Sequence, residues 1–285
     1  VETQQELNDR VVAATLIGTL QTAYTNFHYL RDVWRRTTEK DALLGVGMTG
    51  IGSGRIQQFD LEATSKLAVE TNKYYATEIG VKQSARITTV KPSGTTSCVL
   101  GTSSGVHAWH NDYYIRRVRV GKNEAIYTYL TIHHPELVED DFFKPETQAV
   151  ISIPQRAPND GILRHETSLE LLERVKDIYN RWIVPGHREG NNTHNVSCTV
   201  SVRDEEWEEV GKWMWQNREY YNGIAVLPYF GGNYKQAPFE DIDKETFEGM
   251  FIKLKEIDLS NVVEIIDNTN LTGELACAGS NCELS

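Results

Sequence analysis

Apolar and polar residues alternate along this chain in patterns that change several times between helical and strand-like periods. Near the start, apolar residues recur at three- and four-residue spacing, which predicts helix over residues 4–36, with a second helical stretch from about 29 to 36. These apolar positions are Leu7, Val11, Ala14, Ile17 and Leu20. Further helices are predicted at 61–79 behind an Asp60 cap, at 167–182, at 205–221 behind an Asp204 cap, and at 244–256.

Short runs of β-branched and apolar residues between these helices predict strands. The runs lie at residues 43–50, 86–90, 148–153, 195–202 and 224–227, and the last reads as a buried strand. Pro154 and Pro228 are expected to end the third and the fifth. Because helices separate several of the strands, the pattern predicts parallel βαβ units of an α/β fold. Active sites of such folds collect after the carboxyl ends of the strands, which here are Val90, Ile153, Val202 and Leu227.

The loop after the second strand has the composition of an anion site. Residues 88–97 read TTVKPSGTTS, with one glycine among several hydroxyl residues, and a second small-residue run, GTSSG, follows at 101–105. Backbone N–H groups and hydroxyls in such a loop can donate to a phosphate. The loop lacks the Gly-Lys-Ser/Thr ending of a Walker motif. An ordinary Ser/Thr-rich loop is the alternative that composition leaves open.

Composition narrows the class of protein. The 285 residues are 40% hydrophobic with a mean hydropathy of −0.44, and no apolar run approaches the length of a membrane span. Nothing resembles a signal peptide, so we expect an intracellular, cytoplasmic chain. A net charge of −11 argues against a nucleic-acid surface. Arg116, Arg117 and Arg119 form a dense basic spot, which favours a half-exposed strand with surface charges over an anion site.

Four cysteines are too few for a disulfide framework. Cys98 and Cys198 have apolar or β-type neighbours and are predicted to be core thiols. Cys277 and Cys282 stand four residues apart among small residues near the end, where we expect a mobile segment suited to disulfide exchange. A surface disulfide, half a zinc site or coincidence are alternatives. Since the chain starts at Val1 rather than Met, we also expect a part of a larger protein.

Several segments together resemble one enzyme family. Residues 88–109, TTVKPSGTTSCVLGTSSGVHAW, resemble the substrate-phosphate loop of ribonucleotide reductase catalytic chains and its continuation. The Cys-four-residues-Cys ending resembles the C-terminal redox tail of that family. LLGVGMTGI at 43–51, NNTHNVSCTVSVRDEEW at 191–207 and GIAVLPYFGGNYKQAPF at 223–239 are similar to the family as well. The resemblance covers nearly the whole chain, in order.

The resemblance implies an α/β fold that is the second half of a ten-stranded barrel, over residues 1–268, with a flexible redox-active tail over 269–285. It implies reduction of ribonucleotides to 2′-deoxyribonucleotides by a thiyl radical. The phosphates of a ribonucleoside di- or triphosphate would be held by Pro92, Ser93, Gly94, Thr95 and Thr96.

The same resemblance gives the terminal cysteines a role. Cys277 and Cys282 would re-reduce a disulfide formed in the active site at each turnover, and a thioredoxin or glutaredoxin would reduce them in turn. The radical cysteine of the family lies in an Asn-x-Cys-x-Glu loop, which this sequence lacks, and Asn281-Cys282-Glu283 has the wrong spacing. We therefore expect the radical cysteine and the substrate-reducing pair upstream, in an N-terminal half that is a required partner.

The segment after the fifth strand bears on the class of reductase. Enzymes with a separate radical-generating subunit carry two adjacent tyrosines there, whereas this chain has Pro228-Tyr229-Phe230. The amino-acid sequence of residues 191–239 resembles adenosylcobalamin-dependent enzymes more closely. No residue is assigned to cobalamin, and no metal ligands are expected. The histidines at 107, 110, 187 and 194 are interpreted as surface or hydrogen-bonded loop residues. Alternatives are a class I large subunit, a phosphate-binding barrel isomerase or lyase, and a non-catalytic nucleotide-binding module.

Overall fold

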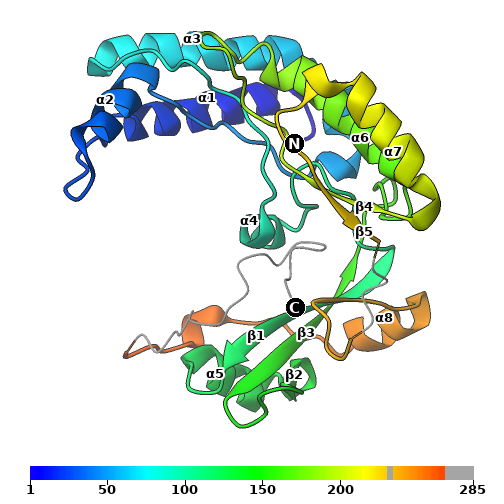
Figure 1. The fold of residues 1–285 in the computed structure, drawn as a ribbon. Helices are drawn as coiled ribbons and strands as arrows, with labels where there is room; N and C mark the ends of the chain where they lie inside the picture. The colour runs from blue at the N-terminus through cyan, green and yellow to red at the C-terminus, as the bar shows by residue number, and fades with distance from the viewer. Residues whose placement is uncertain (230–233, 267–285) are drawn as a thin grey trace. The chain divides into compact units, whose positions relative to one another are not determined.

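The computed structural model describes residues 1–229 and 234–266 (Figure 1). These residues form two compact units. The first comprises Val1–Ala108 and Asp160–Tyr229, and the second comprises residues 109–159 with the described residues from 234 onward. The two units thus alternate along the chain, and each is built from two separate segments. The predicted boundary at residue 268 lies outside the described residues and stays a prediction.

The first unit has six α-helices among the described residues, and three of the six begin at a side-chain cap. They are α1 (Gln4–Gln21), α2 (Asp32–Asp41), α3 (Leu61–Ile79), α4 (Gly94–Val99), α6 (Ser168–Ile178) and α7 (Trp207–Gln216). The carboxylate of Asp60 accepts the N–H of Ala63 at 2.9 Å and caps α3 as predicted. At α6, Thr167 and Glu170 form a capping box.

The predicted helix over 4–36 is interrupted. It ends at Gln21, where the hydroxyl of Thr22 donates to the carbonyl of Thr19 at 2.7 Å and a turn follows. Such side-chain bonds offer the backbone an alternative to the helix. The next helix begins at Asp32 rather than near Tyr29. The helix predicted from Glu205 to Tyr221 is also shorter, because 3₁₀ turns over Asp204–Glu206 and Arg218–Tyr220 lie on either side of α7.

Four predicted strand segments lie side by side in parallel. β4 (Thr199–Val202) pairs with β5 (Ala225–Pro228) from Thr199↔Ala225 to Val202↔Pro228. Parallel bridges Val46↔Thr88 and Val90↔Val196 join the segments 43–50, 86–90 and 195–202. The spatial order is therefore the sequence order, and the prediction of parallel strands is confirmed for these four.

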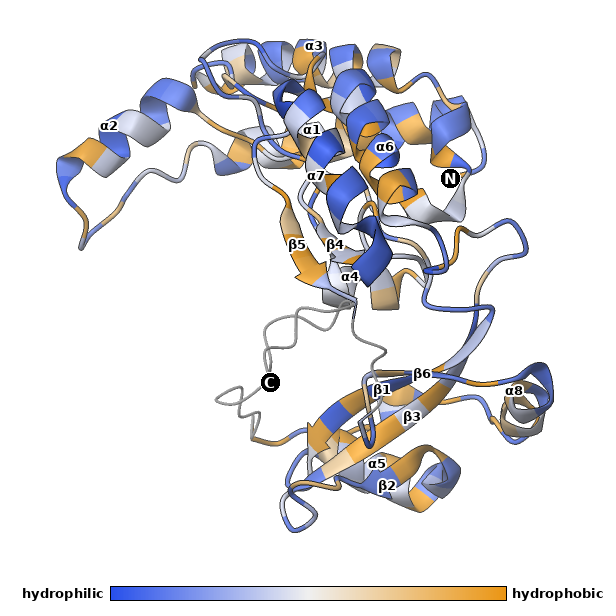
Figure 2. Cartoon of the chain, turned by 45° about the vertical axis from the view of Figure 1, so that its right-hand side comes forward, coloured by the Kyte–Doolittle hydropathy of each residue, from blue (hydrophilic) through white to orange (hydrophobic). Residues whose placement is uncertain are grey.

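The helices α1, α3, α6 and α7 lie on one side of the parallel strands (Figures 1 and 2). The core between them includes Leu44, Val46, Leu172, Trp182 and Val196. β5 was predicted to be buried, but only Val226 is half-buried and its neighbours are exposed. The reason is that β5 has β4 on one side and, among the described residues, no strand on the other.

The second unit is an antiparallel sheet with two helices. Its strands β1 (Tyr113–Gly121), β2 (Val138–Asp140), β3 (Gln148–Arg156) and β6 (Phe239–Asp241) are arranged in the order β2-β3-β1-β6, with α5 (Ala125–His133) and α8 (Lys244–Phe251). The strand predicted at 148–153 is therefore antiparallel and does not join the parallel set. It also continues through Pro154, because β2 pairs only as far as Ile151 and leaves one side of β3 open there.

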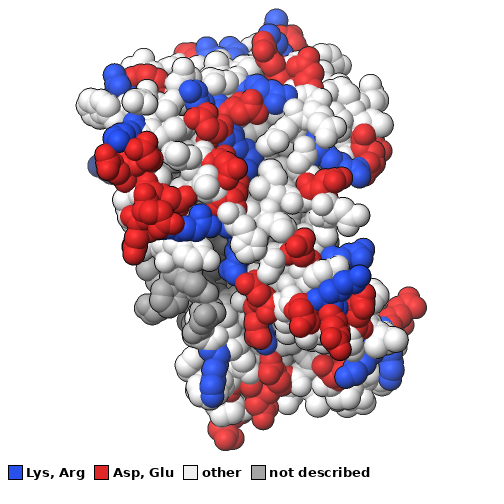
Figure 3. All heavy atoms as spheres, turned by 90° about the vertical axis from the view of Figure 1, so that its right-hand side faces the viewer, with Lys and Arg blue, Asp and Glu red and all other residues white. Residues whose placement is uncertain are grey.

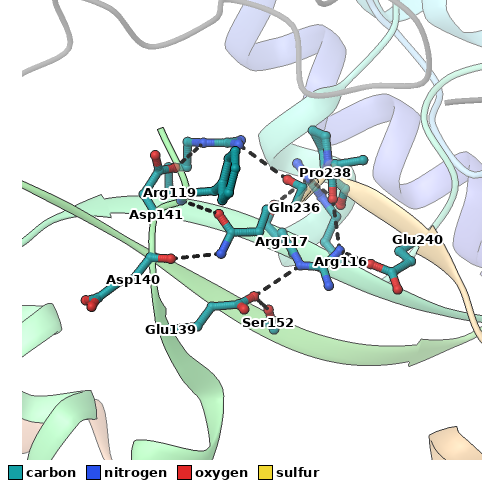
Figure 4. Close-up of polar contacts among 12 residues, drawn as sticks. Arg116, Arg117, Arg119, Glu139, Asp140, Asp141, Ser152, Gln236, Pro238 and Glu240 are labelled. Carbon is teal, nitrogen blue, oxygen red and sulfur yellow. Dashed lines mark hydrogen bonds and ion pairs between the residues drawn. The ribbon is translucent and has the colours of Figure 1, made fainter. Parts of the chain in front are cut away.

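The three arginines of β1 are paired rather than free. Arg117 contacts Glu139 at 3.3 Å and Glu240 at 2.6 Å, and Arg119 contacts Asp141 at 2.8 Å (Figure 4). The prediction of a partly exposed strand is confirmed, but the Arg117 side chain is only 9% exposed and is therefore less exposed than predicted. Its partners lie 22 and 123 residues away in sequence, so local sequence gave no sign of them.

Charge is mixed on the molecular surface. On the face shown in Figure 3, Lys and Arg side chains of the described residues lie among Asp and Glu side chains. None of the helices in the described part of the chain has both the length and the apolar character needed to cross a bilayer.

Candidate functional site

The predicted phosphate loop lies where the second parallel strand ends. The chain leaves Val90, passes Lys91 and Pro92, and enters the short helix α4 at Gly94. Pro92 is exposed, and Ser93 and Gly94 are half-buried. The N–H groups of Gly94 and Thr96 have no acceptor among the described residues. These N–H groups and the exposed Thr96 hydroxyl can donate to an anion.

Thr49 holds this loop to the end of the first strand. Its hydroxyl donates to the carbonyl of Ser103 at 3.0 Å and accepts the N–H of Gly105 at 2.9 Å. The same oxygen contacts the Ser93 hydroxyl. Because the Thr49 proton is given to Ser103, Ser93 is the donor in this contact. Thr49 therefore joins one strand end to both small-residue runs.

Ser104 and His107 extend the network to β4. The Ser104 hydroxyl accepts the N–H of Ser93 at 2.9 Å. Nδ1 of His107 lies 3.0 Å from the Ser104 carbonyl, and Nε2 lies 3.1 Å from the N–H of Thr199. Nδ1 must carry the proton, since its partner is a carbonyl, and Nε2 then accepts. Burial lowers the pKa of His107, which keeps the ring neutral.

A buried ion pair supports the chain beneath the loop. Nε of Arg174 donates to the carbonyl of Val106 at 3.0 Å, and its two terminal nitrogens each lie 2.6 Å from a Glu166 oxygen. The bidentate geometry fixes the guanidinium. Arg174 is buried in α6, so this contact attaches the end of the loop region to the helix layer.

Glycine is required where the loop region passes the segment after Thr49. A Cβ on Gly52 would lie 2.3 Å from the carbonyl oxygen of His107, and one on Gly105 would lie 2.7 Å from the carbonyl of Lys91. Gly105 also has a φ of 54°, in the left-handed region. Only glycine allows these backbones to approach so closely.

The two cysteines predicted to be core thiols differ. Cys198 is buried in the core, and burial raises the pKa of its thiol to about 12, so it stays protonated. Cys98 is exposed, contrary to the prediction. The segment 94–99 forms α4, and Ser97 takes the buried position of that helix while Cys98 and Val99 face solvent.

A polar cavity of about 530 Å³ lies beside the loop in the first unit. We call it the amide pocket. Its lining residues are Thr89, Lys91, Asn192, Thr193, His194, Asn195, Ser197 and Asn222. Thr89, Lys91, Asn195 and Ser197 alternate along two neighbouring strands, so their side chains share one face of the sheet. No carboxylate lines this cavity.

The remaining predicted site residues are placed as follows. Cys277 and Cys282 lie outside the described residues, and Thr95 is described only as part of α4. The four histidines singled out in the sequence are hydrogen-bonded or ion-paired: His107 and His194 each bond a carbonyl through Nδ1, His187 lies 2.9 Å from the Gly190 carbonyl, and His110 pairs with Asp241. Among the described residues, no three His, Cys, Asp or Glu side chains are grouped to hold a metal ion.

Sequence reasoning missed the residues that hold the loop. Thr49, Ser104 and His107 were not proposed as site residues, although Thr49 lies in the glycine-rich segment 43–51. The one sequence signal that could have identified Thr49 is its position as a hydroxyl residue at the end of a predicted strand. The amide pocket was not foreseen, because its lining comes from three separate segments.

Comparison with known proteins gives a consistent result. No protein-family model matches the chain. An adenosylcobalamin-dependent ribonucleoside-triphosphate reductase of Lactobacillus acidophilus is 26% identical over 95% of this chain and 40% of its own length. Those of Lactobacillus leichmannii and Lactobacillus helveticus are 29% and 26% identical over 77% and 85% of this chain, and 29% and 36% of their own lengths.

A solved structure shares the fold. The crystal structure of a B12-dependent, class II ribonucleotide reductase superimposes with a TM-score of 0.74 at 22% identity, over 90% of this chain and 39% of that one. The chain therefore spans about two fifths or less of the length of the proteins it matches. The resemblance found in the sequence is confirmed, and so is the α/β character of the fold.

Proposed function

We propose that this chain is the part of a ribonucleotide reductase that binds the substrate phosphates and carries the disulfide-exchanging tail. What carries the proposal is the loop of residues 92–97 at the end of a parallel strand, held by Thr49 and Ser104 with unpaired N–H groups left for an anion. Pro92, Ser93, Gly94, Thr95 and Thr96 would hold the phosphates of a ribonucleoside di- or triphosphate. The relatives, all named triphosphate reductases, support this assignment.

The four parallel segments are proposed to belong to a ten-stranded α/β barrel. Thr89 donates its N–H to Val46, and Leu44 and Val46 donate theirs to the neighbouring strand. The amides of Leu43, Gly45 and Gly47 therefore face the other edge, and at the opposite end of the sheet no strand among the described residues pairs with the outer side of β5. Two open edges suit a sheet that further strands of a longer enzyme close into a barrel.

The proposed chemistry requires residues that this sequence does not contain. The ribose loses its 2′-hydroxyl as water and gains hydrogen, while two active-site thiols supply the two electrons and become a disulfide. Cys277 and Cys282 would reduce that disulfide by thiol exchange, become a disulfide themselves, and be restored by a thioredoxin or glutaredoxin. The thiyl radical would form on a cysteine of an N-terminal half, since no Asn-x-Cys-x-Glu motif occurs here.

We propose adenosylcobalamin as the cofactor of the complete enzyme, which would supply the radical. None of the described residues is assigned to this cofactor, and we derive no step from it. A tyrosine relay from a radical-generating subunit is not favoured. Among the described residues, no tyrosine ring stacks on Tyr229, and the guanidinium of Arg203 lies over its ring at 5.3 Å.

The test is a reduction assay with this chain and a polypeptide that carries the radical cysteine. Ribonucleotides and reduced thioredoxin would be supplied with and without adenosylcobalamin. We expect deoxynucleotide only with the cofactor, and we expect Cys277→Ser with Cys282→Ser to abolish repeated turnover but to leave a single turnover. The Cys98→Ser variant serves as the control, since this exposed thiol has no assigned role. Absence of product from two associated polypeptides would contradict the proposal.

A further inference from the structure

The first two segments of the parallel set part just before the phosphate loop begins. The N–H of Thr89 donates to the carbonyl of Val46 at 3.0 Å. In a regular parallel pair, the N–H of Met48 would then donate to the carbonyl of Thr89. That bond is absent among the described residues, and the N–H of Gly50 donates to the carbonyl of Ser103 at 2.9 Å instead. The Thr89 carbonyl therefore requires another donor.

The indole of Trp182 supplies this donor. Its Nε1 donates to the Thr89 carbonyl at 3.1 Å, and the Trp182 side chain is fully buried. A buried indole N–H normally finds an acceptor, so a hydrogen bond by itself is expected of any core tryptophan. What distinguishes Trp182 is its acceptor, because the Thr89 carbonyl is the one from which the neighbouring strand segment has turned away.

A π-helical turn over Tyr179–Ile183 presents this tryptophan. The turn continues α6, and within it the N–H of Val184 donates to the carbonyl of Tyr179 at 3.0 Å. The carbonyl of Trp182 receives no backbone N–H among the described residues, since the N–H of Gly186 donates to Ile183 at 3.2 Å. Turns of this kind inside α-helices frequently lie at functional sites.

Two hydroxyl groups bond the Trp182 carbonyl in place of a backbone N–H. The hydroxyl of Thr88 donates to it at 2.5 Å, and the hydroxyl of Ser65 in α3 donates to it at 2.8 Å. Both side chains are fully or almost fully buried. Two consecutive strand residues, Thr88 and Thr89, are thus bonded to one residue of the helix layer, which fixes the end of this strand against the helices.

These bonds control how the chain leaves the sheet for the phosphate loop. Pro92 lies three residues after Thr89. On one side of the strand, the N–H of Val90 donates to the carbonyl of Asn195 at 3.1 Å. On the other side the first segment has left, and the indole of Trp182 bonds the strand there. Donors that are already held in place lose less conformational entropy when an anion binds them.

We infer that Trp182 is a positioning residue for phosphate binding. Its indole replaces the departed strand at the Thr89 carbonyl, and it thereby holds the donors of residues 92–96 in the arrangement that an anion requires. This inference rests on the proposed function, and it gives Trp182 a role that is exerted through the strand, without contact to the phosphates.

Calorimetric binding of inorganic tripolyphosphate to the full 285-residue chain tests the inference. Trp182→Phe keeps an aromatic ring in the core and removes the indole N–H. We expect this variant to bind tripolyphosphate about three- to ten-fold more weakly, an effect of the size of one hydrogen bond.

Trp213→Phe is the matched control. Trp213 is buried in the same hydrophobic core, and its indole donates to the carboxylate of Glu173 at 2.5 Å rather than to a strand. A protein that merely loses a buried indole bond should become less stable in urea and keep its affinity for tripolyphosphate. If Trp182→Phe and Trp213→Phe bind tripolyphosphate equally well, Trp182 has no positioning role.

Nitrogen–proton NMR of the indole groups gives a second measurement, on the unaltered chain. The Trp182 resonance should shift when tripolyphosphate binds, whereas the Trp213 resonance should not. A Trp182 resonance that stays unshifted in the bound chain would overturn the inference, even if Trp182→Phe does not fold. An unaltered chain that fails to bind tripolyphosphate would contradict the phosphate loop itself, and the inference with it, whereas equal binding by the unaltered chain and Trp182→Phe would remove the inference alone.

Discussion

Nε2 of His107 accepts the backbone N–H of Thr199 at 3.1 Å, and this bond joins the loop region to the first residue of β4. The other ring nitrogen donates to the Ser104 carbonyl at 3.0 Å. Both bonds require the neutral ring with its proton on Nδ1. Burial holds the pKa of His107 below its usual range, and the nearby Arg174 acts in the same direction. A protonated ring would lose the bond to Thr199.

The stability of the chain should therefore fall in mild acid. The folded pKa of His107 is lowered, so the unfolded chain binds more protons once the pH falls below the unfolded value of about 6.5. His107 makes its whole contribution to the free energy of unfolding above that pH, and this contribution declines as the pH falls toward the folded pKa. The pKa of His194 is also lowered, so His194 contributes a decline of the same sign. His107→Gln, which keeps an acceptor near Nε2 and does not titrate, should flatten the decline. Urea unfolding across this range measures it.

The exposed His28 provides the control for this titration. His28→Gln should keep the full decline. Carboxylates with lowered pKa, such as Glu206, act only below about pH 4.5 and do not overlap with this window. A His107→Gln protein that loses stability as steeply as the unaltered chain would contradict the assignment.

Removing the Thr49 hydroxyl should loosen the loop. Thr49→Val keeps the shape, leaves the Gly105 N–H without its partner, and removes one of the two hydrogen bonds to the Ser103 carbonyl, which still accepts the N–H of Gly50. We expect a loss of about 1–3 kcal/mol in the free energy of unfolding, together with weaker tripolyphosphate binding. Thr77→Val is the matched control, because the Thr77 hydroxyl only returns to its own helix at Lys73 on an exposed face. Equal losses in the two variants would rule out a special role for Thr49.

Two glycines give opposite expectations for the same substitution. Gly52→Ala places a Cβ 2.3 Å from the His107 carbonyl oxygen, so backbone must shift, at a cost of about 1–3 kcal/mol. Gly211 lies inside α7 with nothing within 4 Å of its Cβ position. Gly211→Ala should stabilise the chain by about 0.5–1 kcal/mol through helix propensity. Thermal unfolding of both variants checks the pair, and a neutral Gly52→Ala would show that the contact relaxes freely.

Thiol reactivity should distinguish the two described cysteines. In a protein with Cys277→Ser and Cys282→Ser, two of the four cysteines remain, Cys98 and Cys198. Cys98 is exposed, whereas Cys198 is buried with its pKa raised to about 12. A disulfide reagent should therefore modify one thiol in the folded protein and two in denaturant. Modification of both thiols at equal rates without denaturant would mean that Cys198 is accessible.

Features that depend on near neighbours in sequence were predictable. The Asp60 cap of α3 and the parallel strands 86–90 and 195–202 follow from residue types and periodicity. The end of α1 at Gln21 was not predicted. The hydroxyl of Thr22 bonds the carbonyl of Thr19 in place of a continuing helix only once the turn is formed. The exposure of Cys98 was missed, because apolar neighbours do not show which side of a short helix is buried.

Features that depend on distant partners were not predictable. The charges of Arg117 and Arg119 were read as exposed, yet their carboxylate partners arrive from β2, β6 and the segment between β2 and β3. In the candidate site, the sequence indicated the loop 92–96 but not Thr49, whose partner Ser103 is 54 residues away. The sequence shows which groups can donate a hydrogen bond, but it does not show which acceptor the fold brings next to each donor.

The buried pair of Arg174 and Glu166 gives the last expectation. The side chains are 5% and 12% exposed, and Arg174 also donates to the Val106 carbonyl just beyond the loop. Arg174→Met leaves a buried carboxylate unpaired and should cost about 3–5 kcal/mol, whereas Arg174→Met with Glu166→Gln should recover part of that loss. Lys66→Met, which breaks the exposed pair with Glu62, should cost almost nothing. Urea unfolding of the four proteins checks this order. If Arg174→Met costs no more than Lys66→Met, the pair does not hold Val106, and the loop depends on Thr49 and His107 alone.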